Sequence, residues 1–156
     1  MRGEKVRLTL ILAVLFLTVP IARAQVAAPS SDLKVIGTMS ELMIRIIYPS
    51  SDAVFYITTR TPETEVQWGE LQGQTLMLAE SANILMLPGH ARDQEQWMAD
   101  AKLMRDAGAA AFKAAKAKDV TALEAVNDQL YQSCTTCHMH YRRNYGRGAT
   151  PGAGVR

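Results

Sequence analysis

Apolar residues recur at alternating steps of three and four along most of this chain, which is the spacing of an amphipathic helix with one buried face. Residues 61–87 and 93–118 each keep this spacing for about seven turns. The predicted core positions of the first are Trp68, Leu71, Thr75, Leu78, Ala82 and Leu85. Those of the second are Trp97, Ala101, Met104, Gly108, Ala111 and Ala115. No strand pattern competes with these helices.

Capping residues mark where these helices begin. Thr61 followed by Pro62 predicts the start of the first helix, and Asp93 with Gln96 fits a capping box at the start of the second. Asp119 predicts the start of a last helix from residue 120 to about 145. The core positions of that helix are Leu123, Val126, Leu130, Cys134, Cys137 and Tyr141.

A further helix is predicted at the start of the domain, from about Asp32. Its core positions are Val35, Met39, Leu42 and Ile46. Pro49 removes a backbone donor and should kink or break this helix before residues 50–58 continue it. The four helices and their short links predict an all-α antiparallel four-helix bundle over residues 32–145.

The N-terminus has the pattern of a secretory signal. Three basic residues precede an apolar run over 8–19, and the small residues Ala22 and Ala24 follow it. We expect residues 1–24 to be a signal peptide that is cleaved after Ala24, with a flexible leader over 25–31 and a glycine-rich tail over 146–156. The apolar run is shorter than a membrane span of about 20 residues. The processed protein is therefore expected in the periplasm, without a membrane span.

Charge argues against a nucleic-acid partner. The whole chain has 17 Lys and Arg against 15 Asp and Glu, but the predicted signal peptide holds four of the basic residues and one acidic residue. The processed chain is thus nearly neutral, whereas nucleic-acid-binding domains are strongly basic.

The last predicted helix carries the chemistry. Cys134, Cys137 and His138 are separated by three and four residues and share one face of a helix. This is the motif for attaching haem c, in which each sulfur forms a thioether with a vinyl group and the histidine ligates the iron. A zinc site would need further ligands, and the chain has only two cysteines. A redox dithiol usually lies at the start of a helix in a βαβ fold. The pattern favours haem over both.

An exported four-helix bundle with Cys134, Cys137 and His138 on its last helix resembles the class II c-type cytochromes, which include cytochrome c-prime and its low-spin relatives. Tyr141 and Arg142 match the aromatic and basic residues that follow the motif in that family. The resemblance implies one covalent haem c, thioether bonds at both cysteines, His138 as proximal iron ligand, and Tyr141 and Arg142 near the haem.

Members of this family differ in the distal ligand of the iron, on the side opposite the proximal histidine. Cytochrome c-prime leaves this side open behind an apolar side chain of the first helix, whereas low-spin members place a methionine there. Met43 matches the low-spin pattern best, and Met39 is the second choice. Thioether sulfur is a soft ligand that favours Fe(II), so a His/Met haem suits one-electron transfer.

The sequence therefore favours an electron carrier, because no catalytic arrangement of residues stands out in it. The alternatives are a five-coordinate haem protein that binds NO or CO, and a haem-free thiol oxidoreductase that uses Cys134 and Cys137. The expected partners are a redox donor, a redox acceptor and the machinery that matures c-type cytochromes. The family resemblance also implies a homodimer through the first two helices as an option.

Overall fold

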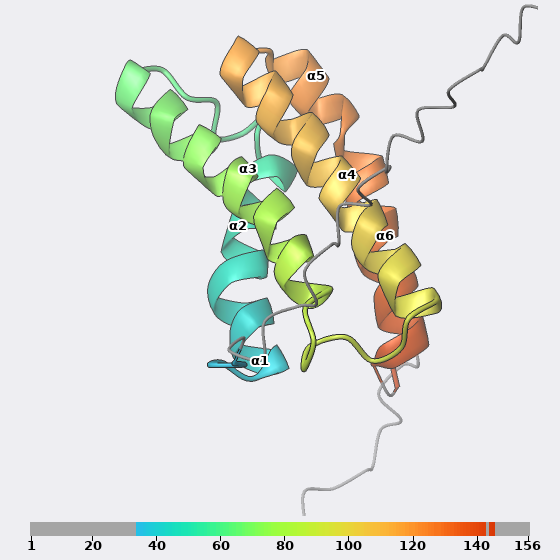
Figure 1. Ribbon diagram of the computed structural model, residues 1–156. Helices are drawn as coiled ribbons and strands as arrows, with labels where there is room; N and C mark the ends of the chain where they lie inside the picture. The colour runs from blue at the N-terminus through green and yellow to red at the C-terminus, as the bar shows by residue number, and fades with distance from the viewer. Residues whose placement is uncertain (1–33, 143, 146–156) are drawn as a thin grey trace, which may run out of the picture. The chain divides into compact units, whose positions relative to one another are not determined.

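The computed structural model describes residues 34–142 and 144–145. All regular structure in these residues is helical, and four helices pack against one another (Figure 1). No helix within them is both long enough and apolar enough to cross a membrane. The predicted signal peptide (1–24), leader (25–31) and tail (146–156) lie outside the described residues.

The first helix is made of three consecutive segments, α1 (Met39–Leu42), η1 (Met43–Ile47) and α2 (Tyr48–Phe55). It begins later than predicted, and Val35 lies before it. The reason is a capping box, in which Thr38 Oγ1 accepts from the Glu41 amide at 3.2 Å and the Glu41 carboxylate accepts from the Thr38 amide at 2.9 Å. The box satisfies backbone donors that a helix start leaves unpaired.

The helix does not stop at Pro49. Segment η1 is a π-helix in which the Tyr48 amide donates to the carbonyl of Met43, five residues earlier. A proline ring crowds the carbonyl one turn before it and has no N–H to donate, so a wider turn immediately before Pro49 accommodates it. Met43 is the first residue of this wider turn.

The two long helices, α3 (Glu65–Leu85) and α4 (Gln96–Ala117), lie side by side (Figure 1). Every core position predicted for them is buried. Helix α3 begins after Thr64 rather than Thr61, because Thr64 forms a capping box with Gln67. The Thr61 hydroxyl instead donates to the Ile57 carbonyl at 2.9 Å.

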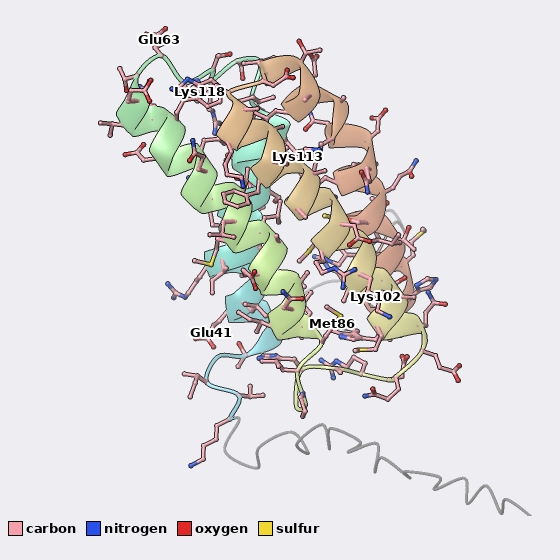
Figure 2. All side chains as sticks on the ribbon, turned by 45° about the horizontal axis from the view of Figure 1, so that its top comes forward. Glu41, Glu63, Met86, Lys102, Lys113 and Lys118 are labelled. Carbon is pink, nitrogen blue, oxygen red and sulfur yellow. The ribbon has the colours of Figure 1, made fainter. Side chains whose placement is uncertain are left out.

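Small residues let α3 and α4 approach closely. A Cβ atom on Gly108 would lie 2.7 Å from the backbone nitrogen of Ala79. Most charged side chains lie on the outside of the helices, as Lys102 and Lys113 do on α4 (Figure 2), whereas Asp100 of α4 is buried. At the end of α4, Lys118 adopts a left-handed conformation and pairs with Glu65 at 2.5 Å.

The last predicted helix is divided in two, α5 (Val120–Ala125) and α6 (Asn127–Tyr141), and it ends before residue 145. The predicted cap is confirmed, since Asp119 Oδ1 accepts from the Ala122 amide at 2.9 Å. Helix α6 packs against α4. Its predicted core positions are buried at its start and partly buried toward its end, at Leu130, Cys134, Cys137 and Tyr141. The fold thus brings the cysteine segment next to the start of α4.

Candidate functional site

Two cavities lie along the cysteine segment of α6. The larger, of about 390 Å³, is lined by Cys137 and His138, and the smaller, of about 40 Å³, is lined by the same two residues together with Cys134. All three side chains are partly buried. The helix face predicted to carry the two thiols and the imidazole therefore faces the two cavities and is partly buried.

Two methionines of the first helix also line the larger cavity. Met39 on α1 and Met43 on η1 both line it, together with His138 of α6. Met43 also lines the smaller cavity, so it contributes to both. The sequence singled out these two methionines, and the structure brings both of them to the same space as His138.

Aromatic residues close one side of the larger cavity. Trp97 of α4 and Tyr141 of α6 both line it, and their rings pack edge to face with centroids 4.9 Å apart. The indole Nε1 of Trp97 donates to the carbonyl of Leu85 at 2.7 Å, and the Tyr141 hydroxyl donates to the Asp93 carboxylate. Hydrogen bonds thus hold both rings in place, and Trp97, predicted as a core residue, also belongs to the site.

Burial changes the protonation of the site. It raises the pKa of the Cys134 thiol, and together with the negative charge of Asp100 it raises the pKa of Cys137 to about 11. It lowers the pKa of His138, with a smaller contribution from nearby Arg142. The imidazole is therefore held in its neutral form, which is the form that ligates metals. Partial burial and the hydrogen bond to Asp93 raise the pKa of Tyr141 to about 12.

A buried carboxylate at the site was not predicted from the sequence. Asp100 of α4 lines the smaller cavity, and its Oδ2 lies 2.7 Å from Nδ1 of His140 on α6. A sequence signal existed, because Asp100 lies between the core positions Trp97 and Ala101 of an otherwise apolar helix face. An acidic residue so close to a buried stripe needs a partner.

Arg142, predicted to lie near the haem, is at the site, whereas Trp68, Gly108 and His90 do not line its two cavities. Trp68 is buried in the core, as predicted, and Gly108 contacts α3 rather than a cavity. His90 lines a separate cavity of about 560 Å³ beside α1. Arg142 lines the larger cavity of the site, and its guanidinium lies 5.6 Å from the ring centroid of Tyr145.

The residues at the site fit a haem with thioether attachment. The larger cavity falls within the range of about 300 to 1,000 Å³ that is common for cofactor and ligand sites. Its walls combine a neutral imidazole, the Cys137 thiol, thioether sulfurs and aromatic rings, and the Cys134 thiol lines the smaller cavity beside Cys137. Among residues 34–142 and 144–145, no cluster of three or more His, Cys, Asp or Glu side chains is arranged to hold a metal ion. A haem iron needs only one or two ligands from the protein.

Comparisons with known proteins give no match. No family model matches the chain, and no curated protein or solved structure shows significant similarity to it.

Proposed function

We propose that this protein is an exported monohaem c-type cytochrome of class II that carries single electrons. In this proposal haem c is attached through thioethers at Cys134 and Cys137, His138 is the proximal iron ligand, and Met43 is the distal ligand, with Met39 as second choice. The observation that carries the proposal is that His138 and Cys137 of α6 line the same cavity as both methionines of the first helix, while Cys134 lines the smaller cavity with Cys137.

The residues of the chain would each serve a distinct purpose. Haem supplies a one-electron Fe(III)/Fe(II) couple when bound. His138 offers a neutral imidazole, and the thioether of Met43 is a soft donor that favours Fe(II). Trp97 and Tyr141 cover the site with fixed rings, which limits the access of water.

The finer features of the fold belong to the same proposal. We infer that the four packed helices form an antiparallel bundle and that the first helix is kinked near Pro49. Support for the kink comes from the π-helical segment η1 directly before the proline, because π turns and prolines are the usual causes of sharp bends in helices. Such turns are frequent at functional sites, and Met43 begins this one.

The cell biology of the proposal follows from the N-terminal pattern and from the motif. Residues 1–24 would direct export to the periplasm, where maturation machinery attaches the haem. The protein would then exchange electrons with a redox donor and a redox acceptor, as a monomer or as a homodimer through its first two helices.

The thiol oxidoreductase alternative has less support. A reactive dithiol needs a lowered thiol pKa, because the thiolate is the nucleophile. Burial raises the pKa of both thiols here, that of Cys137 to about 11. Neither cysteine is placed at the start of a helix, where the helix dipole would lower the pKa.

Mass and absorption spectra of the periplasmic protein test the proposal. We expect a chain that starts at Gln25 and carries the mass of one haem, and a low-spin reduced spectrum that CO does not change. A spectrum altered by CO would instead indicate the five-coordinate, gas-binding alternative. A chain without added mass, together with a reversible disulfide between Cys134 and Cys137, would refute the cytochrome.

A matched pair of variants tests the distal ligand. Met43→Ala should turn the haem high-spin and let the ferrous form bind CO, whereas Met39→Ala should leave the spectrum as it is. The two residues lie one turn apart and line the same cavity, so they control for each other. The reverse result would make Met39 the ligand, and no change in either variant would remove methionine ligation.

A further inference from the structure

A buried carboxylate beside the site has no part in the proposed function. The Asp100 side chain is 1% exposed, with Oδ2 2.7 Å from His140 Nδ1. Its other oxygen, Oδ1, accepts from Nε2 of Gln96 at 2.9 Å. A buried carboxylate is costly unless it is paired in this way, and replacing such a pair with apolar residues often costs nothing. Stability alone therefore does not explain why this buried carboxylate lies next to a candidate redox site.

Asp100 is the member of this contact that lies at the site. The His140 side chain is 40% exposed, whereas the Asp100 carboxylate is enclosed, so water screens the charge of the carboxylate much less than it would at the surface. Asp100 lines the smaller cavity together with Met43 and His138. The groups that bond to Asp100 or line the smaller cavity with it come from four elements, namely Gln96 of α4, His140 and the cysteine segment of α6, Met43 of η1 and Leu85 of α3.

The influence of the carboxylate reaches the residues of the motif. After burial, the charge of Asp100 is the next cause of the raised pKa of Cys137, and it also contributes to the raised pKa of Tyr141. These residues lie on either side of His138 along α6. His138 itself lines the smaller cavity together with Asp100.

We propose that Asp100 is a positioning residue whose buried carboxylate lowers the reduction potential of the site. This inference rests on the proposed function. Ferric haem carries one more positive charge than ferrous haem, so a nearby negative charge stabilises the oxidised state. The transfer moves one electron from donor to acceptor and neither forms nor breaks a bond. Asp100 thus opposes the thioether of Met43, which favours Fe(II).

The test compares Asp100→Asn with Asp106→Asn. Both variants remove one negative charge from α4, but the Asp106 side chain is 56% exposed and pairs with Arg105 at the surface. Asparagine at position 100 keeps an oxygen that can accept from Gln96. In redox titrations of the haem-loaded proteins at pH 8, Asp100→Asn should raise the ferrous to ferric ratio about tenfold at fixed potential, about 59 mV for one electron. Asp106→Asn should change it about twofold or less, because water screens exposed charges.

A second variant keeps the carboxylate and removes its partner. His140→Gln removes the imidazole whose Nδ1 lies 2.7 Å from Asp100 Oδ2, so less hydrogen bonding offsets the charge of the carboxylate and the reduction potential should fall below that of the parent protein. A rise in both Asp100→Asn and His140→Gln would indicate loosened packing and would overturn the inference. If the Asp100→Asn variant does not fold, the test rests on His140→Gln. A reduction potential of His140→Gln at or above that of the parent protein then overturns the inference.

The outcomes separate this inference from the function on which it rests. A parent protein without covalent haem overturns both. A haem-loaded parent whose Asp100→Asn and Asp106→Asn variants have the same potential overturns the role of Asp100 and leaves the cytochrome intact.

Discussion

Gly108 provides the sharpest test of how α3 and α4 fit together. A Cβ atom at this position would lie 2.7 Å from the backbone nitrogen of Ala79 and 2.8 Å from its Cα. Contacts this short are not tolerated, and backbone atoms inside a helix cannot move aside as a side chain can. Gly108→Ala should therefore force the two helices apart.

Two energetic effects of opposite sign determine how much Gly108→Ala changes the free energy of unfolding. Alanine is better than glycine inside a helix by about 0.8 to 1 kcal/mol, which favours the variant. Overpacking a close contact costs about 1 to 3 kcal/mol, and two backbone clashes place Gly108→Ala in the upper part of that range. The net expectation is a loss of about 1 to 2 kcal/mol in the free energy of unfolding.

Gly73→Ala is the matched control. Gly73 lies on exposed surface of α3, and a Cβ atom there would meet nothing within 4 Å. This variant should gain about 0.8 to 1 kcal/mol, so the difference between the two variants isolates the packing cost of about 2 to 3 kcal/mol. Urea unfolding followed by circular dichroism measures both. Equal stabilities would refute the close contact between α3 and α4.

Two further predictions concern caps and acid stability. Asp119→Ala should lower the free energy of unfolding by about 1 kcal/mol, because the Ala122 amide loses its acceptor. The control is Thr121→Ala on the exposed face of α5, which should change the free energy of unfolding little. Equal losses in the two variants would refute the cap. Tyr141→Phe removes the main cause of the lowered pKa of Asp93, ahead of the Trp97 amide. A lowered folded-state pKa stabilises the protein above the ordinary value near 3.8, and this contribution is lost as the pH falls through the lowered value. Tyr141→Phe should thus be less stable than the parent at pH 7, with a difference that shrinks in acid, and a difference independent of pH would contradict this.

Every core position that the sequence predicted on α3 and α4 is buried, because a helix of seven turns repeats its pattern often enough to fix its phase. The pattern did not predict the other buried residues of these helices, which are Ala79, Ser81, Asp100, Ala107 and Ala114. Helix starts were less predictable. Thr61 and Thr64 are both suitable caps, and only the reciprocal bond from Gln67 decides for Thr64. The site, too, was only partly predictable from the sequence. Spacing on α6 predicted a shared face for Cys134 and His138, but no local pattern could pair Asp100 with His140, since that contact joins residues 40 positions apart.

The contacts around His138 explain why a CxxCH motif alone does not define this site. Two polar contacts join the start of α4 to the end of α6, from Asp93 to Tyr141 and from Asp100 to His140. Both partners on α6 follow His138 within three residues, so the segment that would ligate iron is held against α4 just beyond the imidazole. Helix α4 is in turn held against α3 by the bond from Trp97 to the Leu85 carbonyl. The orientation of His138 therefore depends on one acidic residue of α4 and one in the link just before it, and a variant that keeps the motif but lacks them should lose the geometry of the site before it loses the fold.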